Sequence, residues 1–232
     1  MRLNLQVLRE LDEDRLQSRT VRIPVENVTL TGDLDIPRAA RGLVLFAHGS
    51  GSSRYSPRNR AVAATLREAG LATLLFDLLS PEEEEKDEFT AQFRFDIELL
   101  ARRLTVVTKE VADDPECRSL GLGYFGASTG AAAALIAAAA HGSRVQAVVS
   151  RGGRPDLADD VLSEVTAATL LIVGERDAEV RRLNQLAFEK MRCQKSLAVI
   201  RQATHLFEER GALDEVAHLA ADWFNQHLKE HR

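Results

Sequence analysis

One glycine-rich turn carries the serine that is best placed for covalent chemistry. The segment Gly126-Ala127-Ser128-Thr129-Gly130 matches the pattern G-x-S-x-G; an apolar run typical of a buried strand precedes it, and an alanine-rich run typical of a helix follows it. In that context a sharp strand-to-helix turn lifts the serine hydroxyl above the end of a sheet, and the glycines leave room for the turn. A bare match is more often an ordinary turn, but the strand–turn–helix context predicts Ser128 as a nucleophile.

A serine hydroxyl is a weak nucleophile at neutral pH, so it needs a base, and the base needs an acid that orients it. Asp177 and His205 each follow a strand-like run, and they come after Ser128 in the order serine, acid, histidine. The carboxyl ends of parallel strands meet at one edge of a sheet, where these side chains would converge. The pattern therefore predicts His205 as the general base and Asp177 as the acid, with Glu175 as an alternative acid.

The loop His48-Gly49-Ser50-Gly51-Ser52-Ser53 directly follows the apolar run 43–47. Hydrolysis of an ester passes through a tetrahedral oxyanion, which preorganised backbone N–H groups stabilise. We expect one N–H from Thr129, the residue after the nucleophile, and the other from Ser50, so these two residues would form an oxyanion hole.

Several residues around this loop are candidates for substrate contacts. They are His48, Gly49, Arg54, Tyr55 and Arg151. Arg151 and its neighbour Arg154 would lie at the carboxyl edge of the sheet and could attract an anionic group. Pairing of an arginine with Asp77 or Asp156 is the alternative interpretation.

A second glycine pattern overlaps the serine turn. The segment Gly121-Leu122-Gly123-Tyr124-Phe125-Gly126 matches G-x-G-x-x-G, which in dinucleotide-binding proteins follows a strand and precedes an acidic residue about 20 positions later. Here residues 113–118 are too polar for a central strand, and residues 145–148 contain no acid. We therefore reject a nucleotide site.

The elements that must position these residues follow from the hydrophobic pattern. Two alternating stretches, 20–25 and 28–35, predict an antiparallel hairpin. Beyond them, strand-like runs alternate with helix-like stretches, which predicts crossover units. The strand-like runs are 42–47, 72–76, 120–125, 145–149, 169–173 and 196–200, and the helical stretches are 57–69, 91–112, 129–141, 178–192 and 212–230. We expect an α/β fold: a mainly parallel eight-stranded sheet with an N-terminal antiparallel hairpin, helices on both faces and no large lid.

Composition limits the classes of protein that fit. Hydrophobic residues make up 45% of the 232 residues and the net charge is −5, which favours one soluble globular domain and argues against nucleic acid as a partner. Cys117 and Cys193 are isolated, so neither a disulfide nor a zinc site is expected. The N-terminal residues contain no apolar stretch long enough to predict a signal peptide or a membrane span. We therefore expect a cytoplasmic protein without a membrane partner. Residues 1–19 form an extension (a helix, an edge strand or a tail) to a single domain over 20–232.

Taken together, these residues resemble the dienelactone hydrolase family of α/β hydrolases over about residues 20–230. The resemblance rests on segments 46–53, 123–130, 150–156 and 203–207. It implies ester hydrolysis through an acyl-enzyme without a metal or organic cofactor, and it places the acid at Asp177. The chain is most similar to a bacterial branch whose members also occur fused to a phosphoribosyltransferase domain, which we do not recognise here. Family namesakes use a cysteine nucleophile, so Ser128 leaves dienelactone in doubt as the substrate.

We therefore expect a serine hydrolase of small carboxylic esters or lactones. Thioesterases, acyltransferases and peptidases use the same triad, and the sequence does not separate them. The alternative from another class is a weakly active or non-catalytic module that binds a ligand or regulates a partner. A homo-oligomer is neither required nor excluded by any pattern in the chain.

Overall fold

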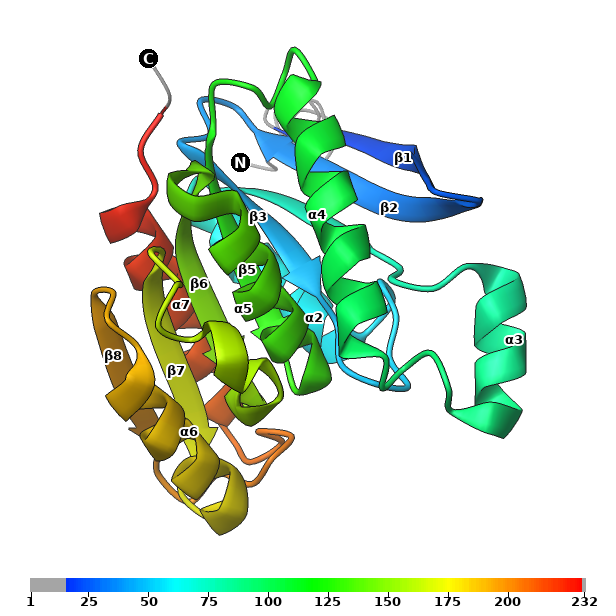
Figure 1. Cartoon of the computed structure of the whole chain (residues 1–232). Helices are drawn as coiled ribbons and strands as arrows, with labels where there is room; N and C mark the ends of the chain where they lie inside the picture. Colours follow the sequence, from blue (N-terminus) through cyan, green and yellow to red (C-terminus); the bar gives the residue numbers. More distant parts are fainter. Residues whose placement is uncertain (1–15, 231–232) are drawn as a thin grey trace, which may run out of the picture.

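Eight strands form one open sheet (Figure 1) in a computed structural model that describes residues 16–230. Their order across the sheet is β1-β2-β4-β3-β5-β6-β7-β8. The strands are β1 (Leu16–Val25), β2 (Val28–Pro37), β3 (Gly42–Ala47), β4 (Ala72–Phe76), β5 (Gly121–Ala127), β6 (Val145–Arg151), β7 (Ala168–Gly174) and β8 (Lys195–Ile200). The pairs β1–β2 and β2–β4 are antiparallel and all others are parallel. The predicted mainly parallel sheet with an N-terminal hairpin is confirmed.

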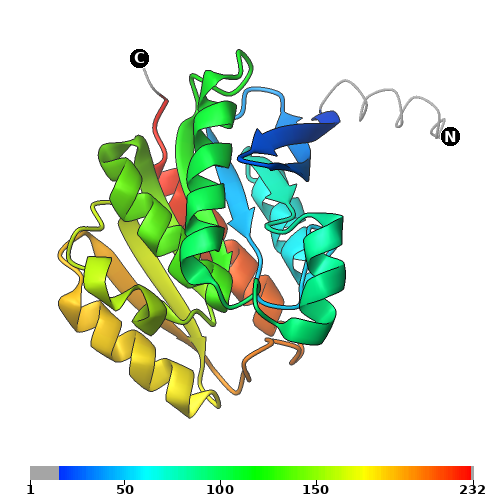
Figure 2. The ribbon, with the colours of Figure 1, turned by 45° about the vertical axis from the view of Figure 1, so that its right-hand side comes forward.

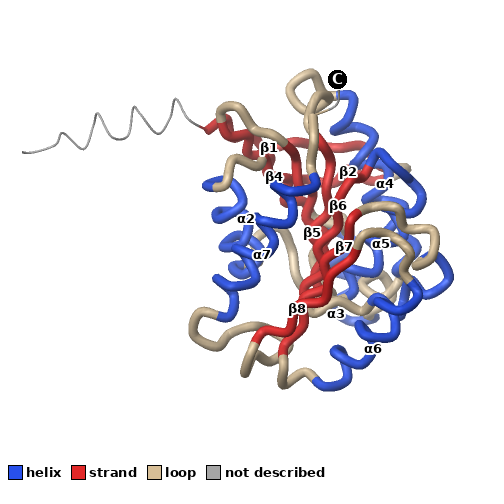
Figure 3. Tube along the Cα trace, turned by 90° about the vertical axis from the view of Figure 1, so that its left-hand side faces the viewer, coloured by secondary structure: helices blue, strands red, loops and turns tan. Residues whose placement is uncertain are grey.

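Helices cover both faces of the sheet (Figure 3). On one face lie α2 (Pro57–Glu68) and α7 (Ala212–His227), and on the other lie α4 (Ile97–Asp113), α5 (Thr129–His141) and α6 (Ala178–Lys190). Val44 and Phe46 join the apolar core on the α2/α7 side, whereas Leu43 and Leu45 join the opposite core. Successive side chains of a strand point to opposite faces, so a strand covered on both sides needs an unbroken apolar run.

The hairpin begins earlier than the sequence predicts. β1 starts at Leu16, four residues before the expected boundary at residue 20, and Leu16 pairs with Pro37 of β2. Residues 16–19 are exposed, so they carry no apolar alternation that could mark them as strand. The rest of the predicted extension, residues 1–15, lies outside the described residues.

The stretch predicted as one helix over 91–112 contains a turn, and a separate helix precedes it. α3 (Pro81–Thr90) begins with a capping box between Ser80 and Glu83 and ends at Ala91, whose φ is +53°. Asp96 then accepts a hydrogen bond from the Leu99 N–H and starts α4. Figures 1 and 2 show α3 standing out to one side of α4. The acidic run from Pro81 is therefore a helix start, where carboxylates favour the positive end of the helix dipole.

None of the helices within residues 16–230 combines the length and the apolar character needed to cross a bilayer.

Candidate active site

Ser128 lies at a single-residue junction between β5 and α5. Its φ of +50° and ψ of −121° are unusual for a residue with a side chain, and such a conformation costs about 1–3 kcal/mol unless its surroundings enforce it. The following glycine explains the sharpness of the turn, because a Cβ at Gly130 would lie 2.2 Å from the Ala47 carbonyl oxygen of β3. The amino end of α5 thus packs directly against the loop that follows β3.

The end of β6, the segment after it and the first turn of α5 hold the strained serine in place. The Ser128 N–H donates to the Arg151 carbonyl at 3.2 Å, and the Ser128 carbonyl accepts from the Arg154 N–H at 3.1 Å. The Ala131 N–H donates to the same Ser128 carbonyl at 3.1 Å. Three backbone hydrogen bonds therefore fix the turn from both sides, which is the over-determination that a strained residue requires.

Asp177 and His205 meet at the same edge of the sheet. His205 Nδ1 lies 2.6 Å from Asp177 Oδ2. A carboxylate that accepts from Nδ1–H keeps the other ring nitrogen, Nε2, unprotonated and available as a base. Glu175, the alternative acid, instead accepts a hydrogen bond from the Gln202 N–H at 2.7 Å. The acid in contact with the histidine is the one that the resemblance implies.

Gly152 lies against His205 and next to the residue that holds the Ser128 turn, and sequence reasoning missed it. Its φ is +52°, and a Cβ built on it would lie 3.2 Å from the His205 carbonyl oxygen and 3.4 Å from Nδ1 and Cε1 of the ring. Its N–H donates to the Ile172 carbonyl at 2.8 Å. The imidazole therefore packs over a position without a side chain, next to Arg151, whose carbonyl holds Ser128. The positive φ and the contact both favour glycine here.

Replacing Gly152 by alanine should lower both stability and activity. The positive φ should reduce the free energy of unfolding by about 1–2 kcal/mol, and pressure of the new methyl group on His205 should lower kcat by about 10- to 100-fold. Gly142→Ala is the matched control, because Gly142 has a φ of +54° and no atom within 4 Å of an added Cβ. Urea unfolding and ester hydrolysis should show that both variants lose stability and that only Gly152→Ala loses activity. Equal activity in the two variants would contradict the packing role.

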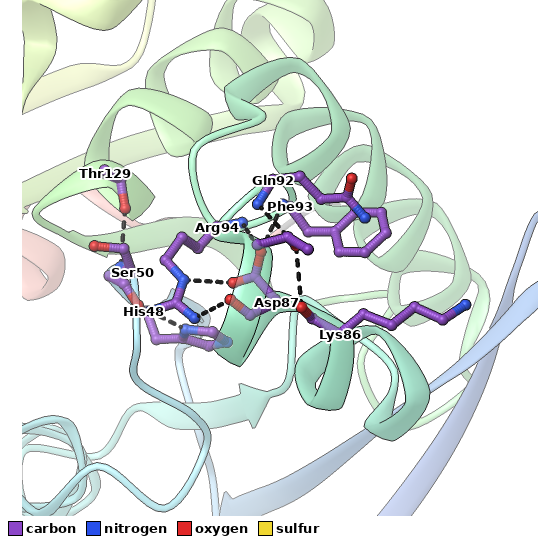
Figure 4. A network of polar contacts seen from close by, with 10 residues as sticks. His48, Ser50, Lys86, Asp87, Gln92, Phe93, Arg94 and Thr129 are labelled. Atoms are coloured by element: carbon purple, nitrogen blue, oxygen red, sulfur yellow. Dashed lines mark hydrogen bonds and ion pairs between the residues drawn. The ribbon is translucent and has the colours of Figure 1, made fainter.

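The two predicted oxyanion residues are in direct contact (Figure 4). The Ser50 N–H donates to Thr129 Oγ1 at 3.0 Å, and a Cβ at Gly49 would lie 3.0 Å from Ser128 Cβ. The loop after β3 therefore lies against Ser128. In the structure, however, the Thr129 hydroxyl already accepts the hydrogen bond of the Ser50 N–H. An incoming oxyanion would have to take the place of this hydroxyl.

His48, a predicted substrate contact, uses both ring nitrogens within the protein. Its Nε2 accepts from the Leu78 N–H at 3.0 Å, and its Nδ1 lies 3.1 Å from the Gly49 carbonyl. Because Nε2 is an acceptor, the proton is on Nδ1. Burial lowers the pKa of His48, so the ring is held neutral. The imidazole links the loop after β3 to the loop after β4.

This neutral histidine should make stability depend on pH. Below the ordinary histidine pKa of about 6.5 the unfolded chain gains a proton at His48 that the folded chain refuses, so the free energy of unfolding falls by up to about 1.4 kcal/mol per pH unit. Urea unfolding at pH 7.5 and 5.5 should show the decrease, and His48→Gln should reduce it. Burial also lowers the pKa values of His141 and His227, so part of the decrease should persist. An unchanged difference in His48→Gln would contradict this account.

Three further predicted positions form contacts within the protein. The Arg54 guanidinium pairs with Asp77, and its Nε lies 3.6 Å from Asp33. The Tyr55 ring lies under that guanidinium, 4.2 Å from its central carbon, and the side chain is exposed. Arg154 binds Asp156 through two hydrogen bonds of 2.7 and 2.8 Å. The alternative interpretation of arginine pairing thus describes Arg54 and Arg154, but not Arg151.

A cavity of about 330 Å³ lies beside the oxyanion loop. One wall is the loop 48–53, and the other comes from α3, α4 and their surroundings: Leu79, Glu84, Asp87, Glu88, Arg94 and Leu100. Asp87 organises the second wall, because its carboxylate accepts hydrogen bonds from the Phe93 N–H and from both the backbone N–H and Nε of Arg94 (Figure 4). The sequence pattern predicts the first wall. It does not predict the second, because no pattern in residues 81–96 indicates that they lie beside the loop 48–53.

Within the part of the chain that the structure describes, no three His, Cys, Asp or Glu side chains are arranged to hold a metal ion. The groups that the site offers are a strained serine, an imidazole oriented by a carboxylate, and backbone N–H groups at the amino end of α5.

Known proteins are similar to this chain in sequence and in fold. A family model described as an alpha/beta hydrolase domain matches residues 40–226. The crystal structure of dienelactone hydrolase from Anabaena variabilis is 56% identical in sequence, with a TM-score of 0.91, and the match covers 93% of this chain and 100% of that one. Est1E from Butyrivibrio proteoclasticus is 16% identical with a TM-score of 0.75 over 89% of this chain and 98% of its own, a likeness of fold alone.

Two curated proteins from strains of Mycobacterium tuberculosis are 56% identical to this chain over 213 residues. Both are provisionally named phosphoribosyl transferases. The match covers 92% of this chain and 47% of each of those proteins, so the chain spans about half the length of these curated relatives. Their name refers to proteins about twice as long as the matched region.

Proposed function

The chain belongs to the α/β hydrolases, in the dienelactone hydrolase-like family, and from this premise we propose that it is a serine hydrolase of small carboxylic esters or lactones. The observation that carries the proposal is the conformation of Ser128, held at φ +50° between a strand and a helix by three backbone hydrogen bonds. Strained backbone conformations cluster at functional sites, and a strained serine at a strand–turn–helix junction is the arrangement that exposes the nucleophile of α/β hydrolases.

The proposed reaction begins with attack of Ser128 Oγ on the carbonyl carbon of the ester. His205 Nε2 takes the hydroxyl proton, and the Asp177 carboxylate, 2.6 Å from Nδ1, stabilises the imidazolium that forms. Collapse of the tetrahedral intermediate breaks the bond to the alcohol oxygen, which receives the proton from His205. Water then attacks the acyl-enzyme by the same route, with His205 again acting first as base and then as acid.

The negative oxygen of each tetrahedral intermediate would lie between the backbone N–H groups of Thr129 and Ser50. Thr129 is the first residue of α5, so its N–H has no helical acceptor and carries the positive end of the helix dipole. The Ser50 N–H already donates to Thr129 Oγ1, and a charged oxygen is a stronger acceptor than a hydroxyl. The oxyanion would therefore displace the hydroxyl as charge develops.

The substrate is proposed to be small and polar. The cavity beside the oxyanion loop has about 330 Å³, which lies at the low end of ligand sites of roughly 300–1,000 Å³. The lining residues include the hydroxyls of Ser50, Ser52 and Ser53 together with three carboxylates. Such a lining favours short acyl or alcohol groups over long aliphatic chains.

A panel of short p-nitrophenyl esters, lactones and thioesters tests the proposal. We expect turnover of the short esters. For esters and thioesters of one acyl group with different leaving groups, added methanol should give one constant ratio of methyl ester to free acid, since a shared acyl-enzyme is partitioned. A ratio that varies with the leaving group would contradict the acyl-enzyme. A folded protein that turns over no member of the panel would favour the non-catalytic ligand-binding or regulatory module instead.

A further inference from the structure

Arg151 is a buried cation whose side chain has no hydrogen-bond or ion-pair partner within residues 16–230. It is the last residue of β6, only 8% of its surface is exposed, and its Nε and Nη1 are enclosed without any hydrogen bond. Buried polar atoms in folded proteins are almost always hydrogen-bonded, and a guanidinium has five donors to satisfy. The described residues therefore leave part of the hydrogen-bonding capacity of this side chain unsatisfied.

No carboxylate among residues 16–230 forms an ion pair with Arg151. The charged group that acts on it is a second cation: burial and the like charge of Arg58 together lower the pKa of Arg151 to about 10. The Phe207 ring, centred 5.9 Å from the guanidinium carbon, offers a weak cation–π contact. This contact leaves the donor hydrogens of Nε and Nη1 unsatisfied.

The surroundings of Arg151 carry an excess of positive charge. Arg58 is the second residue of α2, whose amino end adds a partial positive charge. The Arg58 side chain is 35% exposed, and its Nη1 lies 3.1 Å from the exposed carboxylate of Glu208. The charge of Arg58 acts on the Arg151 guanidinium, whereas the acid that pairs with Arg58, Glu208, is exposed.

We propose that Arg151 and Arg58 form a binding site for a small oxyanion, a carboxylate or a phosphate group, at the carboxyl edge of the sheet. Two oxygens of such a group match the parallel N–H donors of a guanidinium, which explains why arginine rather than lysine would stand here. Binding would satisfy the enclosed donors and neutralise the excess charge. The site adjoins the catalytic turn, because the Arg151 carbonyl accepts the Ser128 N–H, but it does not depend on the proposed hydrolysis.

Thermal unfolding with added sodium phosphate or sodium acetate, compared with sodium chloride at equal ionic strength, tests the site without using activity. At ten times the dissociation constant we expect one of the two oxyanions to raise Tm by about 3–6 °C. In Arg151→Met, which fills the same space without a charge, the rise should be absent, and Tm without anion should be equal to or above that of the wild type.

Arg60→Gln is the matched control, since Arg60 is an exposed residue of the same helix, and it should keep the full rise. Arg58→Gln should weaken the rise, and it carries the test if Arg151→Met does not fold. The proposal is overturned if neither oxyanion raises the Tm of the wild type beyond chloride. It is equally overturned if the rise persists undiminished in the Arg151 and Arg58 variants.

The source of the anion follows from a kinetic measurement with a neutral ester. Competition between the stabilising oxyanion and the ester would mean that the anion is part of the substrate. An unchanged KM together with the Arg151-dependent rise in Tm would mean that the anion is a separate ligand. Either result supports the site, and a protein without hydrolase activity would still show the rise in Tm.

Discussion

Ser128→Ala is expected to lower kcat on a short p-nitrophenyl ester by about 10⁴- to 10⁶-fold, because it removes the atom that forms the acyl-enzyme. The residual rate should come from binding and from the oxyanion donors of Thr129 and Ser50. The backbone hydrogen bonds that hold the turn do not involve the serine hydroxyl. The free energy of unfolding should therefore stay within about 0.5 kcal/mol of the wild-type value, as for most substitutions that disturb no buried contact.

Ser52→Ala is the matched control for this loss, since Ser52 lines the cavity in the adjoining loop and has no assigned role in the reaction. It should change kcat by less than about tenfold, which corresponds to the modest worth of one hydrogen bond. Comparable losses in the two variants would mean that cavity polarity, and not the nucleophile, controls the rate. A wild-type kcat in Ser128→Ala would rule out Ser128 as the nucleophile.

Asp177→Asn is expected to lower kcat by about 10⁴-fold. The amide cannot accept the hydrogen bond from Nδ1–H as a carboxylate does, so His205 would favour the wrong tautomer and its imidazolium would lose the stabilising charge. Glu175→Gln should leave kcat within about tenfold of the wild-type value, because Glu175 contacts the Gln202 N–H and not the imidazole. Ester hydrolysis measured side by side for the two variants gives the comparison.

The comparison of Asp177→Asn with Glu175→Gln is informative because the two acids lie on the same short loop, two residues apart. A larger loss in Glu175→Gln than in Asp177→Asn would assign the acid to Glu175. Equal losses would indicate that the loop conformation matters and that neither carboxylate has a specific role. Circular dichroism and urea unfolding should show that both variants remain folded.

The fold and the contact between Asp177 and His205 were predictable because they depend on local patterns. Short apolar runs mark strands that are buried on both faces, such as Gly42–Ala47. Once strands and helices alternate, the ends of parallel strands must share an edge, and this predicts that Ser128, Asp177 and His205 lie at that edge without knowledge of any contact. The contact between Asp177 and His205 at 2.6 Å is the outcome that this topology predicts.

Other features were not predictable, because they depend on contacts between distant segments. Gly152 matters through a ring 53 positions later in the chain, and the second cavity wall depends on Asp87 organising a turn within a stretch that reads as continuous helix. The loop of His48 predicts a position beside the cavity, but not the hydrogen bond that its Nε2 accepts from the Leu78 N–H, 30 residues away. Whether Arg151 has a partner depends on every element packed around it, so no sequence pattern reports it.

Labelling with a fluorophosphonate, followed by mass spectrometry of the tryptic peptides, tests the central proposal most directly. Trypsin should release residues 119–144, between Arg118 and Arg144, as the peptide that contains Ser128. We predict one phosphonyl group per chain, located on Ser128 by fragmentation and absent after Ser128→Ala. Label on another residue, label that persists in Ser128→Ala, or a folded wild-type protein that takes up no label would contradict the account.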